Sequence, residues 1–261
     1  MKLRLVVLGI FLAFGANAAF ADPYASDWSP SAKSRARLVA DGAGGAALEI
    51  ELSPGAITYW RDPGEAGVPP SFDFSRSDNV ANVEVEFPAP SRIPEEDGSV
   101  AFGYRERAIF PLKATAKDVS RPAALRLEVN YAVCEKLCLP ARATLALVLA
   151  NGVSTPYAAE VEAARARVPK KVAAEKLGAD VKAIDSRHWR LCFAGAPGQS
   201  DLFVEPPAGF WLVATRDSAA NCFALDLREA PAGASGAIEM TATLVGGERG
   251  YETVVTLGAA K

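Results

Sequence analysis

The sequence predicts an all-β protein made of two β-sandwiches that a short helix connects. Short runs of β-branched, aromatic and alternating apolar residues recur along the chain, and Pro, Gly, Asp and Ser cluster between them. Only one segment after the N-terminal region has clear helical character, and it separates the runs into two groups. A chain of this length can form one large domain or two small ones.

The first 21 residues have the layout of a cleavable export signal. Lys2 and Arg4 give a positive start, residues 5–14 form an apolar run, and residues 19–21 read Ala-Phe-Ala, so we expect cleavage after Ala21. A membrane anchor is the alternative, but the apolar run is too short to span a bilayer. We therefore expect an exported protein that is not inserted in a membrane after cleavage.

The charge of the chain disfavours two classes of partner. The formal net charge is −3, and removal of Lys2 and Arg4 with the signal changes it by −2, to −5. The sequence contains no basic block. Nucleic acid and anionic lipid are therefore not expected as partners.

The candidate strands fall into two groups. The first group comprises residues 47–52, 57–60, 80–87, 108–115, 124–131 and 143–149. The second group comprises residues 187–194, 200–205, 211–215, 221–227, 237–244 and 251–257.

A helix is predicted between the two groups. Residues 154–156 (Ser-Thr-Pro) offer a cap and a first-turn proline, residues 157–167 are rich in Ala, Glu and Arg, and Pro169 ends the helix. We therefore predict a signal peptide at 1–21, a first domain at 22–155, a helical linker at 156–179 and a smaller domain at 180–261.

Cys134 and Cys138 are the most informative residues for function. In one extended strand they would lie about 13 Å apart, whereas a disulfide needs Cα atoms within about 7 Å. The chain must therefore turn between them, either as a hairpin with loop 135–137 or as one helical turn. The hairpin is favoured because residues 125–131 alternate like a strand. A bond closing so small a ring constrains the unfolded chain little, which favours a redox role over a structural one.

The other two cysteines, Cys192 and Cys222, lie in apolar strand contexts. We predict a structural disulfide between them, with buried free thiols or a second redox pair as the alternatives. No metal site is expected, because His188 is the single histidine and Met240 the only methionine after the signal. No cofactor is expected either, since the sequence has no phosphate-binding or dinucleotide-binding motif.

The run from Tyr131 to Ala141 resembles the active-site hairpin of a known family. The family is that of the amino-terminal periplasmic domain of the thiol:disulfide interchange protein DsbD, and the closest form is the ScsB type (suppressor of copper sensitivity), in which the cysteine spacing is short. Residues 59–70 and 102–107 also resemble this family. Residues 201–207 resemble the second domain of the ScsB type, so the resemblance is strong over 28–150 and weaker over 185–257.

The resemblance implies a fold, a compartment and partners. The fold would be immunoglobulin-like and the protein periplasmic. The Cys134/Cys138 pair would accept electrons from a thioredoxin-like or membrane donor protein and pass them to exported, disulfide-bearing client proteins. In the family the second cysteine forms the mixed disulfide with a partner, which implies that role for Cys138.

The resemblance also implies a loop that covers the disulfide with an aromatic residue. By position this loop is 97–104, with Phe102 as the cap and Tyr104 as the second candidate; a core position is the alternative for Phe102. Trp60 is predicted to wall the site in preference to its neighbour Tyr59, because adjacent strand residues face opposite ways.

A second function, from a different class, stays open. The full transporter of this family continues into a membrane domain and a thioredoxin-like domain, whereas this sequence ends at Lys261 without a C-x-x-C motif. We therefore expect a separate protein to supply the electrons. The alternative is a non-catalytic binding or chaperone-like protein linked to copper stress, in which both disulfides are structural.

Overall fold

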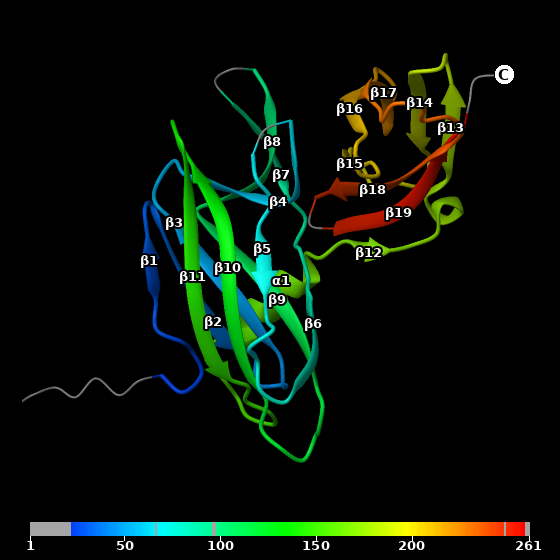
Figure 1. Cartoon of the computed structure of the whole chain (residues 1–261). Helices are drawn as coiled ribbons and strands as arrows, with labels where there is room; N and C mark the ends of the chain where they lie inside the picture. Colours follow the sequence, from blue (N-terminus) through cyan, green and yellow to red (C-terminus); the bar gives the residue numbers. More distant parts are fainter. Residues whose placement is uncertain (1–21, 66, 96–97, 248, 259–261) are drawn as a thin grey trace, which may run out of the picture.

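The computed structural model describes residues 22–65, 67–95, 98–247 and 249–258, so the predicted export signal lies outside the described residues. The described chain forms four sheets, almost entirely antiparallel, that pack in pairs as two sandwiches (Figure 1). The predicted fold class, two immunoglobulin-like sandwiches joined by a short helix, is confirmed.

The first sandwich holds strands β1 to β11. One sheet has the order β1-β2-β3-β9-β6, and the other has the order β11-β10-β4-β8-β7 with β5 paired to β10. The strands are β1 (Ser29–Ser31), β2 (Ser34–Ala40), β3 (Ala46–Leu52), β4 (Ile57–Gly64), β5 (Ser71–Asp73), β6 (Val80–Val85), β7 (Ser91–Pro94), β8 (Val100–Arg105), β9 (Arg107–Ala116), β10 (Ala124–Cys134) and β11 (Cys138–Val148).

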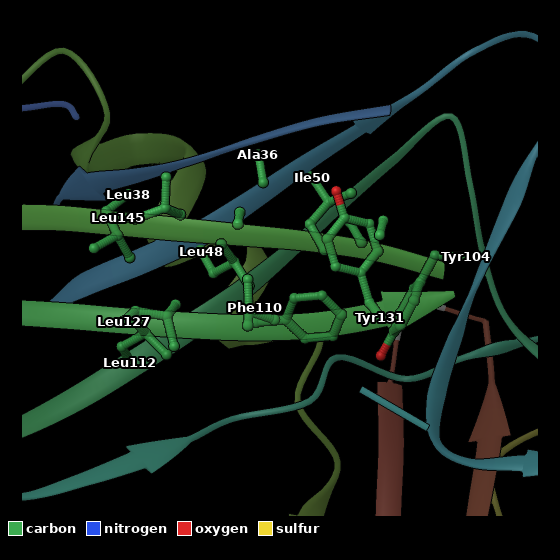
Figure 2. Close-up of a cluster of buried hydrophobic side chains, with 14 of the residues drawn as sticks. Ala36, Leu38, Leu48, Ile50, Tyr104, Phe110, Leu112, Leu127, Tyr131 and Leu145 are labelled. Carbon is green, nitrogen blue, oxygen red and sulfur yellow. The ribbon is translucent and has the colours of Figure 1, made fainter. Parts of the chain in front are cut away.

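The core of the first sandwich lies between these two sheets. Figure 2 shows Leu38, Leu48 and Phe110 from one sheet facing Leu127 and Leu145 from the other, and all five are buried. Because successive strand residues point to opposite faces, the odd-numbered residues 125–133 of β10 enter this core. The even-numbered residues of β10 therefore lie on the outer face of the sheet. They include Cys134, the last residue of the strand.

The connecting helix α1 (Ala158–Ala166) packs on the first sandwich. Val161 is fully buried against Val39 and Ala47, on the outer side of β2 and β3. Thr155, which the sequence offers as part of a helix cap, instead donates a hydrogen bond from Oγ1 to the Ala40 carbonyl at 2.8 Å. The helix is thus held to the first domain by its apolar face.

Residues 170–179, predicted as linker, belong instead to the second sandwich. Strand β12 (Lys170–Lys171) pairs with β19, and the short 3-10 helix η1 (Ala174–Leu177) places Leu177 in the second core. These residues join the second sandwich because Leu177 is buried in its core. The two lysines, Lys170 and Lys171, give the segment the polar look of a linker in the sequence. The predicted linker 156–179 is therefore too long at its C-terminal end.

The second sandwich holds the remaining strands. Its two sheets have the orders β12-β19-β18-β15 and β13-β14-β17-β16. Leu191, Phe193, Leu225 and Leu244 fill the core between them. The strands are β13 (Ala179–Ala183), β14 (His188–Phe193), β15 (Asp201–Glu205), β16 (Trp211–Arg216), β17 (Cys222–Glu229), β18 (Ile238–Gly246) and β19 (Arg249–Leu257).

Aromatic rings join the two sandwiches. The Phe203 ring of β15 meets Trp60 of β4 and Phe102 of β8 edge to face, with ring centroids 5.9 and 4.9 Å away. The pairing of β4 with β8 shifts register between Tyr59 and Gly64, a bulge that lets the intervening residues turn toward the second sandwich. Figure 1 shows β7 and β8 standing between the β10–β11 hairpin and the second sandwich.

An ion-pair cluster lies beside these rings. Arg61 donates two hydrogen bonds to Glu205, from Nε at 2.8 Å and from Nη2 at 2.7 Å, and it also pairs with Glu252. The Arg61 guanidinium stacks 4.5 Å from the centre of the Trp60 ring. One arginine of the first domain thus bridges two carboxylates of the second, and Lys171 lies 3.9 Å from Glu252 as a second cation.

Asp62 makes the stability of this interface dependent on pH. Burial, followed by the nearby Glu205 charge, raises the pKa of Asp62 from 3.8 to about 6, although the Gly64 N–H and Arg61 oppose the shift. A carboxyl whose folded pKa is raised contributes stability that is complete below pH 4 and is lost as the pH rises through about 6.

Asp62→Asn is therefore expected to raise the free energy of unfolding at pH 7.5 by about 2 kcal/mol and to leave it nearly unchanged at pH 4. Urea unfolding at the two pH values measures the difference, and Asp180→Asn, at an exposed position of β13, is the matched control. An equal effect of Asp62→Asn at both pH values would contradict the assignment.

Candidate functional site

A disulfide between Cys134 and Cys138 closes the tip of the β10–β11 hairpin. The two strands pair without interruption up to Cys134 and Cys138, whose Cα atoms lie 4.0 Å apart across the ladder. Residues 135–137 form the loop, and Lys33 pairs with Glu135 at its side. The hairpin that the cysteine spacing favours over a helical turn is confirmed.

The two cysteines differ in exposure. Cys134 is only 3% exposed and belongs to a small apolar cluster with Ile57, Tyr59 and Ala101 on the outer face of the sheet. Cys138 is exposed. A large reactant arriving from solvent therefore reaches Cys138 and not Cys134.

Tyr59 is the side chain that contacts both sulfur atoms. Its hydroxyl donates a hydrogen bond to Cys134 Sγ at 2.9 Å and lies 3.5 Å from Cys138 Sγ. Strand β4 is held at this place because Ile57 pairs with Cys134 and Thr58 Oγ1 donates to the Ala132 carbonyl at 2.9 Å. Burial, with a smaller contribution from the charge of Glu95, raises the pKa of Tyr59. The phenol therefore stays protonated at neutral pH and remains a donor.

Residues 67–70, here named the crossing segment, cover Tyr59 from outside. A Cβ atom on Gly67 would lie 2.2 Å from the Tyr59 ring, and Gly67 has a φ of +115°, so only glycine fits. Val68 and Pro69 then form one wall of a groove of about 360 Å³, and Cys138 lies on its opposite wall. The crossing segment thus covers the Tyr59 ring and leaves Cys138 open to the groove.

Glu95 also faces this region. Its Oε1 atom is buried and finds no hydrogen-bond partner among the described residues, and its charge acts on Tyr59. In the sequence, residues 95–97 look like a solvated acidic loop. Nothing in the sequence singles out Glu95, because its position depends on the pairing of β7 with β8 and of β8 with β4.

Phe102 and Trp60 do not lie over the disulfide, which corrects two predictions. Successive residues of a strand face opposite ways, and on β8 it is Ala101 that faces the Cys134 cluster. Phe102 therefore points to the other face, where it packs on Phe203 of the second sandwich, as does Trp60. Both aromatic residues serve the domain interface, and Tyr59 occupies the place predicted for Trp60.

Tyr104 and the predicted cap loop also differ from expectation. Tyr104 is a core residue: its ring packs on Phe110 with centroids 5.3 Å apart (Figure 2), and its hydroxyl donates to the Pro88 carbonyl. Of the predicted loop 97–104, Asp97 lies outside the described residues, and residues 100–104 belong to β8. A Cβ atom on Gly103 would lie 2.1 Å from the Thr58 carbonyl oxygen of β4. Close approach of two strands explains this glycine.

A second disulfide joins Cys192 to Cys222 in the second sandwich. The two residues lie opposite each other on β14 and β17, and Cys222 is buried. Within the described ranges, no three His, Cys, Asp or Glu side chains are placed to hold a metal ion. Nor is any helix in the described part of the chain both long and apolar enough to cross a membrane.

Comparison with known proteins gives one family and one shared fold. Residues 28–150 match the family described as thiol:disulfide interchange protein DsbD, N-terminal. The N-terminal periplasmic domain of ScsB from Proteus mirabilis has a TM-score of 0.71 at 19% sequence identity, and the match covers 92% of this chain and 100% of that one. At this identity the likeness shows a common fold.

Other structural matches are too weak to support an argument. Endo-fucoidan hydrolase MfFcnA9 from glycoside hydrolase family 107 has a TM-score of 0.20 at 12% identity, over 83% of this chain and 34% of that chain. The C-terminal domain of the Streptococcus agalactiae AgI/II polypeptide BspA has a TM-score of 0.17 at 7% identity, over 83% of this chain and 94% of that chain. No curated protein matches the sequence.

Proposed function

Because residues 28–150 belong to the family of DsbD N-terminal domains, we propose that this protein is a periplasmic thiol:disulfide exchange module. It relays reducing equivalents through Cys134 and Cys138, from a thioredoxin-like or membrane donor protein to exported client proteins. The observation that carries the proposal is the asymmetry of the disulfide: Cys138 is exposed, and Cys134 is buried with a hydrogen bond from Tyr59. Exchange needs an accessible sulfur to attack and a stabilised thiolate to leave.

Loading with electrons begins at Cys138. A thiolate of the reduced donor attacks Cys138 Sγ, the Cys134–Cys138 bond breaks, and Cys134 leaves as a thiolate that accepts the Tyr59 hydrogen bond. The second thiolate of the donor then attacks the donor sulfur of this mixed disulfide. The donor leaves as a disulfide, and Cys138 leaves as a thiolate, so two electrons have been transferred.

Delivery to a client runs through the same sulfur. The Cys138 thiolate attacks a client disulfide, forming a mixed disulfide and releasing one client thiolate. Cys134 then attacks Cys138 Sγ, which restores the bond within the hairpin and releases the second client thiolate. The client is reduced by two electrons, and the module returns to its oxidised state.

The test uses single serine variants and thioredoxin as the donor. The thioredoxin variant lacks its resolving cysteine, so it cannot release itself from a mixed disulfide. In the Cys134→Ser variant, Cys138 is first converted to a mixed disulfide with a small disulfide reagent. A Cys138-linked complex with thioredoxin is then expected to accumulate. With Cys138→Ser, trapping is expected to fall by at least about tenfold, because the remaining thiol is buried. Non-reducing electrophoresis with mass mapping identifies the linked cysteine, and an equal yield of both complexes would refute the assignment of Cys138.

The reduction potential separates this function from the non-catalytic alternative. A working exchange bond is expected above about −300 mV, and a structural bond below that value. We propose that Cys192–Cys222 is the structural bond, since its 30-residue separation constrains the unfolded chain more than the 4-residue separation of the first pair. A potential of the Cys134–Cys138 bond as low as that of Cys192–Cys222 would favour the binding or chaperone-like function.

A further inference from the structure

We infer that the groove beside Cys138 docks an extended, uncharged segment of the partner protein, with the partner's cysteine at Cys138 and an apolar side chain seated over Ala132. This inference rests on the proposed function. Exchange brings a partner sulfur into bonding contact with Cys138, so the partner chain must occupy the surface that begins at this residue. The groove is that surface, because Cys138 is one of its lining residues.

The dimensions of the groove suit a short peptide segment. It follows β11 from Cys138 to Arg142, a length of about 13 Å that accommodates about four extended residues. Ala132, which lies opposite Pro140 in the ladder, has a small side chain and lines the bottom of the groove. Val68 and Pro69 line the side of the groove away from β11. Val68 is 59% exposed, so its side chain is available to a ligand. A volume of about 360 Å³ accepts a side chain of the size of Leu together with its backbone.

The charges around the groove favour a neutral segment. Arg142 is the one charged residue among its described lining residues, and it is paired with Glu128 at 2.5 Å. Ser71 and Asn130, at the same end, are neutral. An acidic or basic segment would find no unpaired opposite charge on these walls, whereas an apolar side chain would be removed from water.

The direction of the backbone argues against docking by strand addition at the edge of β11. The Ala132 carbonyl accepts a hydrogen bond from Thr58 of β4, so the polar backbone atoms of Ala132 point away from β11. Pro140, directly opposite, therefore has its nitrogen at the free edge. A proline nitrogen has no hydrogen to donate, which removes a ladder bond for any added strand. We therefore place the docking surface on the face of the β10–β11 hairpin that carries the groove, and not on its edge.

The test measures how fast Cys138 reacts with peptides that differ only beside their cysteine. The protein is the Cys134→Ser variant, and the probes are blocked peptides whose cysteine carries a thionitrobenzoate leaving group. Leu is placed two residues before or two residues after the cysteine, with Gly or Asp at the same positions for comparison. One of the two Leu peptides is expected to react about tenfold faster than its Gly and Asp counterparts.

Two exposed apolar residues give matched variants. Val68→Ser, in the groove wall, is expected to reduce the ratio of the Leu-peptide rate to the Gly-peptide rate to less than about twofold. The rate with the free aromatic disulfide reagent is measured for each variant and reports the intrinsic reactivity of its Cys138. Leu137→Ser, at the hairpin tip and 76% exposed but outside the groove, is expected to keep the preference. Three results would each overturn the proposal that the groove docks the partner. They are equal rates for the Leu and Gly peptides, a Leu preference that survives Val68→Ser, and a Leu preference that Leu137→Ser abolishes. A Cys138 that does not react with the reagent itself would instead refute the proposed function.

Discussion

Replacing Tyr59 by Phe is expected to lower the reduction potential of the Cys134–Cys138 bond by about 30 mV and to slow its reduction by a small dithiol up to about tenfold. The Tyr59 hydroxyl donates to Cys134 Sγ at 2.9 Å. A thiolate accepts this hydrogen bond more strongly than a disulfide sulfur does, so the bond stabilises the reduced state and the departing Cys134. A difference of about 1.4 kcal/mol, near the lower limit for hydrogen bonds to charged groups, corresponds to about 30 mV for two electrons.

Tyr131→Phe is the matched control for this prediction. Tyr131 is a buried tyrosine of the same hairpin, and its hydroxyl shares a hydrogen bond of 3.0 Å with Ser34 Oγ rather than with sulfur. Its loss is expected to cost about 1 kcal/mol of stability without moving the potential. Equilibration with a glutathione redox buffer measures both variants. If Tyr59→Phe keeps the wild-type potential while folded, the hydrogen bond has no role in exchange.

Arg61→Ala is expected to lower the free energy of unfolding by about 3–5 kcal/mol and to separate the two sandwiches. Arg61 is 28% exposed and holds Glu205 and Glu252, which are 21% and 13% exposed. Without it, Glu205 and Glu252 remain together in a poorly solvated interface next to Asp62, with only the exposed Lys171 near Glu252, and the stacking on Trp60 is lost. Urea unfolding measures the loss of stability, and small-angle scattering measures the separation.

Arg35→Ala supplies the control for an exposed ion pair. Arg35 pairs with Glu51 across β2 and β3, with side chains 50% and 34% exposed, and its removal is expected to cost at most about 1 kcal/mol. Adding Glu205→Gln and Glu252→Gln to Arg61→Ala is expected to recover most of the lost stability, because the two side chains that lost Arg61 are then neutral. A loss for Arg61→Ala no larger than that for Arg35→Ala would show that the cluster does not hold the domains together.

The two faces of β4 connect these predictions. Tyr59 points to the disulfide, whereas Trp60 and Arg61, which follow it directly, contact the second sandwich. The second domain therefore packs against the strand that positions the hydrogen-bond donor of the site. If Arg61→Ala separates the domains and the potential also changes, the second sandwich contributes to the position of Tyr59.

Local pattern alone predicted most of the strands and the shape of the redox hairpin. All twelve predicted strands are present, and the spacing of Cys134 and Cys138 required the turn that the structure contains. Alternating burial is clearest in β10 and β11. Strand β2 was missed because its Arg35 and Arg37 appear polar along the chain. Each faces a glutamate directly across the ladder, Glu51 and Glu49, and that pairing is invisible without the register.

The tertiary structure alone decided which aromatic residue meets the sulfur atoms. Alternation states that Tyr59 and Trp60 face opposite ways, and likewise Ala101 and Phe102, but it does not say which face carries the disulfide. That choice depends on the pairing of Ile57 with Cys134, on the bulge in β4 and on Phe203, which comes from a strand about 100 residues further along the chain. Residue type and spacing determine that a hairpin disulfide forms, because the turn is local. The environment of the disulfide is non-local, since each contact that defines it joins segments distant in sequence.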